Sequence, residues 1–245
     1  MRRGALILVW LWAAAGCGRP QPLRDGRMDC TDPVPLAGGV TVFSCSERGK
    51  PWAIYTASRQ DPVPRRYRKF RRDRPDGLPY GRPRRLSFAP FSMTDPRPLP
   101  DGRLLVRAGQ DFYTMNPDGT WPEKVAGPVP AAASRTPKGR PSEVDLTRRT
   151  GTLLCYAAGR AARVEFLSRT RSLGSYPVEP DGSFLVEVPA DLALRLRTLD
   201  RRGRVIKTGG WFWLRPGETR SCAGCHEPAT RMAENRLVRA LERRP

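Results

Sequence analysis

The sequence predicts a mainly β protein, in which hairpin repeats precede a small β-sandwich and a short helical segment ends the chain. Three observations predict this fold class. A strand–turn–strand pattern occurs twice in the first half of the chain. Apolar and polar residues alternate strictly in the second half. A helical spacing of apolar residues is confined to the last residues.

The N-terminus has the pattern of a bacterial lipoprotein signal over residues 1–17. Arg2 and Arg3 precede the apolar run GALILVWLWAAAG, which is too short to remain as a spanning helix. The run ends in small residues followed by Cys17, where such signals carry the lipid-modified cysteine. An ordinary secretory signal is the alternative. Both predict export, and the first predicts a lipid anchor in the bacterial cell envelope, facing the periplasm or the outer surface, with residues 18–29 as a tether.

The remaining cysteines are interpreted for an oxidising compartment, where disulfides persist. Cys30 and Cys45 are the pair that would close a short loop if the two cysteines near the C-terminus hold a cofactor. Cys155 lies in the apolar run GTLLCYAA and is expected to be a buried thiol.

The formal net charge of +20 does not by itself indicate nucleic-acid binding. Arginine supplies almost all of the excess and is spread along the chain, and an exported lipoprotein seldom meets nucleic acid. The densest basic run, Arg65 to Arg85, interleaves Tyr67, Phe70 and Tyr80. We interpret it as a solvated loop rich in Pro and Gly. Docking to anionic lipid, a polyanion or an acidic redox partner is the alternative.

Two stretches of the first half resemble each other. TDPVPLAGGVTVFS begins at Thr31 and TDPRPLPDGRLLVR at Thr94, and each is followed by a second short strand. Hairpin repeats of this size are typical of β-propeller blades, but a propeller usually needs at least four of them. Residues 30–126 therefore predict a truncated propeller or two hairpins packed on the next domain, and residues 127–142 predict a linker.

Residues 143–210 predict a small β-sandwich. Val186 and Val188 fall on one strand face, and Leu194 and Leu196 alternate with arginines on the next strand.

The remaining segment, residues 211–245, ends in the one helical pattern of the chain, ATRMAENRLVRALERR. A helix is expected after Pro228, with an apolar stripe that contains Met232, Leu237, Val238 and Leu241.

The segment SCAGCHEP holds the only histidine of the chain. Cys222 and Cys225 have the spacing that lets each form a thioether with a haem vinyl group, and His226 is then placed as the proximal iron ligand. These three residues predict one covalent haem c. A structural CxxC disulfide, a redox dithiol and half a zinc site are the alternatives. A zinc site would need further ligands, and a redox dithiol usually lies at a helix start in a βαβ setting.

The sixth iron ligand is not a histidine of this chain, because no second histidine exists. Met93 and Met115 are the candidates, with an open iron position as the alternative, although packing in the core is the default interpretation of both. Met232 would have to pass the porphyrin rim to reach the other face, and we disfavour it.

The residues before the motif supply candidates for the haem surroundings. Trp211, Phe212 and Trp213 are expected to form a haem wall or domain core. Arg215 and Arg220 could pair with propionates, although arginine is abundant throughout the chain.

PVEPDGSFLVEVPADLALRLRTLD, followed by WFWLRPGETRSCAGCHEP, resembles the C-terminal part of the hydrazine synthase alpha subunit middle-domain family. In that family a propeller is followed by a small β domain and a GE-x-x-x-C-x-x-CHE segment. The matching residues here are Gly217, Glu218, Cys222, Cys225, His226 and Glu227. The resemblance covers about Pro177 to Pro228, and the DP-x-PL stretches at Asp32 and Asp95 resemble remnants of blades.

This resemblance implies a shortened member of a group of exported, multidomain haem c proteins. It does not imply hydrazine synthesis, because the chemistry of the synthase belongs to a separate haem-bearing region and this chain has one haem motif. We therefore expect a membrane-anchored monohaem cytochrome lipoprotein with an unidentified redox partner protein, more an electron-transfer protein than an enzyme. The alternatives are a non-catalytic binding or scaffold lipoprotein with a structural CxxC, and a haem-based ligand-binding subunit with an open iron position.

Overall fold

The computed structural model describes residues 23–24, 28–47, 49–58, 83–125, 144–222 and 237–242, and these residues are mainly β, as predicted. The chain divides into two compact units. Unit 1 contains residues 1–87 and 91–113, and unit 2 contains residues 88–90 and 114–245. Within the described ranges no helix has the length and apolar character needed to cross a membrane. The predicted signal with Cys17, the core of the basic run and the predicted linker lie outside the described residues.

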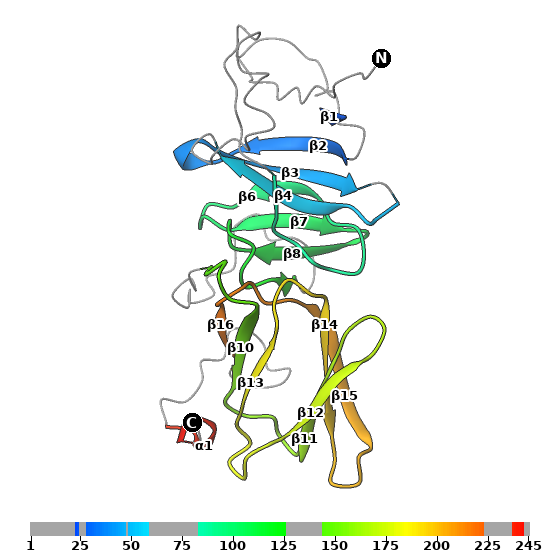
Figure 1. Cartoon of the computed structure of the whole chain (residues 1–245), viewed down its shortest axis with the longest axis vertical. Helices are drawn as coiled ribbons and strands as arrows, with labels where there is room; N and C mark the ends of the chain where they lie inside the picture. The colour runs from blue at the N-terminus through cyan, green and yellow to red at the C-terminus, as the bar shows by residue number, and fades with distance from the viewer. Residues whose placement is uncertain are drawn as a thin grey trace, which may run out of the picture. The chain divides into compact units, whose positions relative to one another are not determined.

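The first half of the chain forms two sheets whose strands follow chain order (Figure 1). The five strands of the first sheet are β1 (Leu23–Arg24), β2 (Met28–Pro35), β3 (Val40–Glu47), β4 (Ala53–Ser58) and β5 (Arg84–Arg85). The four strands of the second are β6 (Thr94–Pro98), β7 (Leu104–Ala108), β8 (Asp111–Met115) and β9 (Glu123–Lys124). The end of the segment expected to be a tether is thus already strand, because β1 pairs with β2.

The two similar stretches adopt the same bulged hairpin. Asp32 and Asp95 have φ angles of 54° and 55°. The register of each hairpin shifts at that position, between Thr31 and Val34 in one and between Thr94 and Arg97 in the other. Aspartate tolerates this left-handed conformation better than most residues, so the TDP sequence specifies the bulge.

The first sheet has a small core that contains a disulfide. Cys30 and Cys45 are register partners on β2 and β3, and they are joined across a sequence separation of 15. A disulfide that closes a loop of this length stabilises the folded state by about 3 kcal/mol, because it lowers the conformational entropy of the unfolded chain. The apolar residues packed around it are Phe43, Ala53, Tyr55 and Ala57.

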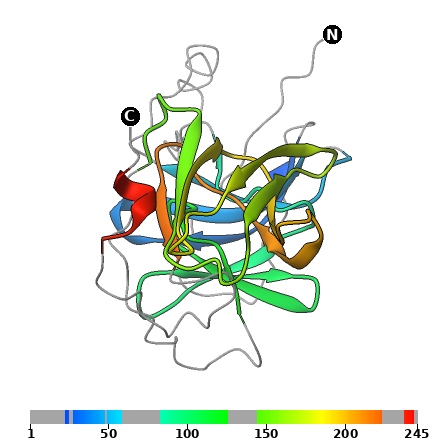
Figure 2. The ribbon, with the colours of Figure 1, turned by 90° about the horizontal axis from the view of Figure 1, so that it is seen from below.

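Unit 2 contains two further sheets that share one hydrophobic core (Figures 1 and 2). The first, in the order β13-β10-β16, consists of β13 (Phe184–Pro189), β10 (Thr150–Cys155) and β16 (Thr219–Cys222). The second, in the order β12-β11-β14-β15, consists of β12 (Ser172–Pro177), β11 (Arg163–Leu167), β14 (Leu194–Leu199) and β15 (Val205–Phe212).

The alternation read from the sequence determines which side chains fill this core. Phe184, Val186 and Val188 of β13 are buried, and the residues between them are more exposed. Leu194 and Leu196 of β14 are buried in the same way. The β-rich domain extends beyond the expected boundary at residue 210, because β16 pairs with β10 and so belongs to the same sheets as the strands before it.

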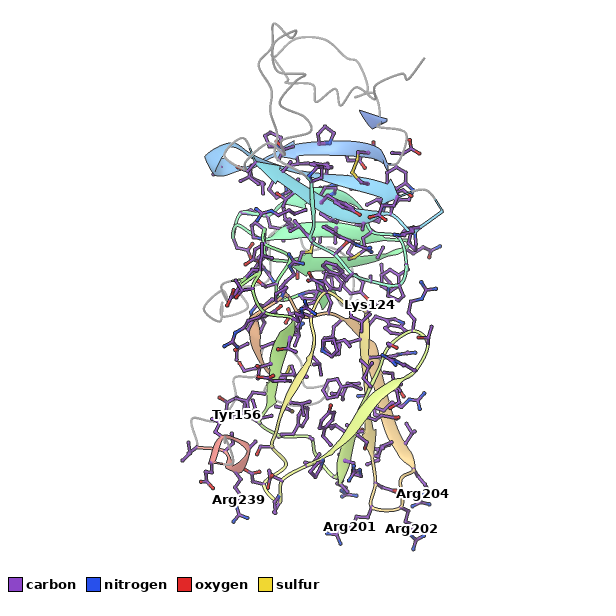
Figure 3. All side chains as sticks on the ribbon, in the orientation of Figure 1. Lys124, Tyr156, Arg201, Arg202, Arg204 and Arg239 are labelled. Carbon is purple, nitrogen blue, oxygen red and sulfur yellow. A yellow bond between two sulfur atoms is a disulfide. The ribbon has the colours of Figure 1, made fainter. Side chains whose placement is uncertain are left out.

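The short helix α1 (Arg239–Glu242) belongs to unit 2 and packs against β10 and β13. Val238 and Ala240 are buried in a cluster with Leu154, and Tyr156 packs against it; Figure 3 shows Tyr156 close to α1. Ser183 Oγ accepts a hydrogen bond from the Ala240 N–H. The expected apolar stripe is wrong at Leu237, which is 74% exposed, because the contact with the sheet begins one residue later. Met232 and the expected start of the helix lie outside the described residues.

Candidate functional site

The first cysteine of the CxxCH motif ends a strand at the edge of its sheet, as far as the sheet is described. Cys222 is the last residue of β16, which pairs in parallel with β10, and its register partner is Cys155. The Tyr156 N–H donates to the Cys222 carbonyl oxygen over 3.0 Å, which fixes the end of the strand. The side chain of Cys222 is half-buried and packs against the shared core. Cys225, His226 and Glu227 lie outside the described residues.

A buried carboxylate organises the start of the same strand. Glu218 has no exposed surface. Its carboxylate accepts hydrogen bonds from two backbone groups, the Arg215 N–H at 2.7 Å and the Trp121 N–H at 3.1 Å. Burial raises the pKa of Glu218 above its ordinary value, against the opposing effects of the Arg220 charge and of these two donors. Glu218, the glutamate of the GE-x-x-x-C segment, therefore connects the start of β16 to the turn around Trp121 through buried hydrogen bonds.

That turn has an unusual backbone. Trp121 has a φ of 54°, a left-handed conformation that is an outlier for a bulky residue. Its N–H is directed to Glu218, so the buried carboxylate stabilises a conformation that the residue disfavours. The turn also presents the Gly119 carbonyl oxygen, which accepts a 3.0 Å hydrogen bond from the indole of the fully buried Trp213. Trp213 is thus domain core.

Arg215 is committed to structural contacts. Its guanidinium pairs with Asp191, donates to the Asp118 carbonyl oxygen over 3.2 Å and lies over the Phe88 ring at 5.2 Å. Only 4% of the residue is exposed. These contacts do not favour Arg215 as a partner for a propionate.

Arg220 interacts with Cys222, and one of its buried N–H groups has no acceptor among the described residues. It packs over the rings of Trp121 and Phe212 at 5.4 and 6.0 Å, and its Nη2 donates to the Pro122 carbonyl oxygen over 3.1 Å. Arg220 Nη1 and Trp121 Nε1 are buried, and neither has an acceptor in the described part of the chain. An acceptor from elsewhere would remove the cost of two unsatisfied buried donors.

The environment of the Cys222 thiol disfavours its ionised form. Burial raises the pKa of Cys222 above its ordinary value, and the neighbouring Cys155 acts in the same direction. The positive charge of Arg220 and its hydrogen bond to the thiol oppose this rise. Among the described residues Cys222 and Cys155 are therefore a close pair of thiols beside one guanidinium.

The candidate sixth ligands are both core residues. Met93 and Met115 have no exposed surface. Full burial agrees with their default interpretation as core, and either thioether would have to leave its packing to face a ligand site. Over the described ranges, no three His, Cys, Asp or Glu side chains are grouped so that they could hold a metal ion.

Sequence reasoning missed two features of this site. The turn from Asp118 to Glu123 belongs to it although it lies nearly a hundred positions before β16. Cys155 was expected to be buried, but not to face Cys222. A signal for the turn existed in the PDG sequence and the tryptophan that follows it, whereas strand pairing over a long separation has no local signal.

The fold and site define a mainly β protein with a small β domain whose edge strand leads into a CxxCH motif. Residues 139–227 match the model of the family described as hydrazine synthase alpha subunit middle domain, which confirms the predicted resemblance. This stretch contains β10 to β16 and the motif, and it is similar to that family over this part of the chain. No curated protein matches the chain.

The solved structure of Kuenenia stuttgartiensis hydrazine synthase resembles this chain, with a TM-score of 0.65 at 13% sequence identity. The similarity covers 89% of this chain and 60% of that one. The present chain thus spans about three-fifths of its length. At this identity the similarity concerns the fold alone.

We expect Glu218→Gln to lower the free energy of unfolding by about 1–3 kcal/mol, because the amide nitrogen cannot accept from the second backbone donor, whereas the hydroxyl oxygen of the acid and the carboxylate oxygen both can. The raised pKa means that the folded state favours protonated Glu218. That stabilisation is complete below the ordinary value of 4.5 and is lost as pH rises through the folded pKa. Denaturant unfolding from pH 4 to 8 should show the largest wild-type advantage at low pH. A difference that does not vary with pH would contradict this. Glu187→Gln on the exposed face of β13 is the control.

Gly217→Ala should be more destabilising than Gly203→Ala, although both glycines have nearly the same φ, 76° and 77°. A Cβ on Gly217 would lie 2.8 Å from the Asp145 Cβ, whereas a Cβ on Gly203 meets nothing within 4 Å. The left-handed conformation costs each alanine about 1–2 kcal/mol. The close contact should add at least about 1 kcal/mol for Gly217→Ala. Equal losses in thermal and denaturant unfolding would show that the contact at Asp145 is not limiting.

Proposed function

We propose that this chain is a membrane-anchored, monohaem c-type cytochrome lipoprotein that transfers single electrons. The observation that carries the proposal is the position of Cys222 at the end of the edge strand β16, so that the CAGCH motif begins where the sheet stops. A segment that leaves a rigid strand at its first attachment residue has one fixed end. This favours a defined cofactor position over a freely moving loop.

The residues near Cys222 fit such a group. Cys222 and Cys225 would form the thioethers and His226 would ligate the iron. Haem, when bound, supplies a one-electron change at iron. Around Cys222 the chain offers the rings of Trp121 and Phe212 and the unsatisfied donors of Trp121 and Arg220. The apolar rings would exclude water from the haem. The buried N–H groups could donate hydrogen bonds to the haem propionate carboxylates.

The burial of the two candidate methionines bears on the sixth ligand of the haem iron. Met115 or Met93 are the methionine candidates, and the full burial of both favours the alternative of an open iron position. That burial is the observation behind a second candidate function, a haem-based subunit that binds a small ligand. A structural CxxC in a scaffold lipoprotein is the alternative without haem.

The finer architecture is also part of the proposal. We infer that the two bulged hairpin repeats are propeller-like, supported by the shared φ at Asp32 and Asp95 and by the parallel register shifts. The two sheets around one core are a small β-sandwich, and the attachment segment follows it with a short C-terminal helix.

The proposed location is the bacterial cell envelope, with lipid on Cys17 and a redox partner protein as the electron donor or acceptor. The Cys30–Cys45 disulfide supports an oxidising compartment. Nucleic acid is not among the proposed partners, and hydrazine synthesis is not proposed.

Co-expression of the full chain with a haem c maturation system is expected to give a pyridine haemochrome that stays with the denatured polypeptide. Cys222→Ala with Cys225→Ala should abolish it, because no thioether can form. The control is Cys30→Ala with Cys45→Ala, which removes the disulfide of the other compact unit and should retain the haem. Absence of haem from the wild-type chain would end the cytochrome proposal, and the native reduced spectrum would distinguish six-coordinate iron from open iron.

Replacement of the lipidation residue should move the protein off the membrane. Wild-type protein is expected in the detergent phase of a Triton X-114 partition and Cys17→Ser in the aqueous phase or uncleaved, because the lipid supplies the anchor. Uncleaved Cys17→Ser keeps its apolar signal and is recognised by its higher mass, so only equal partition of the two cleaved proteins would contradict a lipid on Cys17. Cys155→Ser, a buried cysteine elsewhere in the chain, is the matched control.

A further inference from the structure

We propose that Cys155 and Cys222 form a reversible disulfide in the haem-free protein, which occupies the thiol that the first thioether requires. The pairing is between a residue of the β domain core and a residue of the attachment motif. The strand register and the packing of both side chains on one core support the disulfide. Its effect on haem attachment rests on the proposed function.

The two cysteines are register partners on adjacent strands. β10 and β16 run parallel, and Cys155 is paired with Cys222 at the end of both. Neighbouring strands lie about 4.8 Å apart, and directly paired residues point to the same face of a sheet. Disulfides join Cα atoms separated by about 4.4–6.8 Å. The register therefore brings the two Cα atoms within the range of a disulfide.

Backbone hydrogen bonds hold this register at both ends of β16. The Thr152 N–H donates to the Glu218 carbonyl oxygen over 2.8 Å, and the Tyr156 N–H donates to that of Cys222 over 3.0 Å. Among the described strands β16 has one neighbour in its sheet, β10, so a small adjustment of its last residue disturbs no other described strand. The strand can thus bring its terminal side chain to bonding distance without a change in fold.

Both side chains are on the core side of the sheet. Cys155 is 1% exposed and belongs to the core cluster, and Cys222 packs against that cluster. The raised pKa of Cys222 includes a contribution from Cys155, which places the two thiols within electrostatic range. Arg220 interacts with Cys222 and provides the positive charge that stabilises a thiolate during exchange.

The chemistry is a two-electron oxidation by thiol–disulfide exchange. The Cys222 thiolate attacks the disulfide of an oxidised protein thiol oxidase and releases one of its sulfurs as a thiolate. The Cys155 thiolate then attacks the Cys222 sulfur and releases the other. Two protons and two electrons leave the chain, and the oxidase becomes a dithiol. A dithiol reductant reverses both steps and returns Cys222 for attachment.

The test maps the disulfides of the full chain, made in an oxidising compartment without haem maturation. Reduced thiols are alkylated, and trypsin is used because it releases Cys155 in residues 150–160 and Cys222 with Cys225 in residues 221–231. We expect a cross-link between these two peptides that is lost on reduction. The Cys225→Ser variant should retain it, which assigns the link to Cys222. Cys30 and Cys45 share one tryptic peptide, so its loss of two hydrogens reports that oxidation took place.

The outcomes separate this proposal from the proposed function. Complete alkylation of Cys155 in oxidised protein, with Cys222 linked to Cys225 instead, would overturn the disulfide even if haem attaches. A cross-link in a chain that never accepts haem would leave the disulfide standing and end the cytochrome proposal. With both intact, Cys155→Ala should attach haem with less added reductant than wild type. Cys155→Ser is the second variant if the alanine disturbs the core, and far-UV circular dichroism checks folding of each.

Discussion

The candidate site depends on one buried carboxylate. Glu218 accepts hydrogen bonds from the backbone of Arg215 on its own turn and of Trp121, 97 positions earlier. A buried carboxylate is costly unless it is hydrogen-bonded, so both segments must be in place for the domain to be stable. The same interaction holds Trp121 in a left-handed conformation and so places its ring against Arg220. The surroundings of the attachment cysteine follow from that arrangement.

The spacing of the GE-x-x-x-C segment corresponds to the length of strand β16. Gly217 approaches Asp145 too closely for a side chain, Glu218 anchors the turn, and the next four residues are the strand β16 that ends at Cys222. The distance between the buried glutamate and the first cysteine is therefore the length of one short strand. A residue added or removed between Glu218 and Cys222 would shift Cys222 out of register with Cys155.

Local patterns predicted much of this protein. Alternation identified strands of unit 2, since Val186 and Leu194 are buried as expected, and the TDP repeat identified two hairpins with one bulge geometry. The parallel pairing of β10 with β16 was not predicted, nor was the turn at Trp121, because both depend on contacts between residues far apart in the chain. The prediction that Leu237 is buried was wrong for a related reason. Helical spacing of apolar residues does not determine at which residue the contact with a sheet begins.

The parallel pairing of β10 and β16 also bears on the order in which the domain forms. More than sixty residues separate the two strands, and they contain all the hairpins of β11 to β15. Closing so long a loop is entropically costly until those hairpins have formed, so β16 is expected to join its sheet late in folding. Until then Cys222 is not yet paired with Cys155. If Cys222 carries a haem as proposed, the period available to a maturation enzyme is set by the folding rate of the strands that precede it.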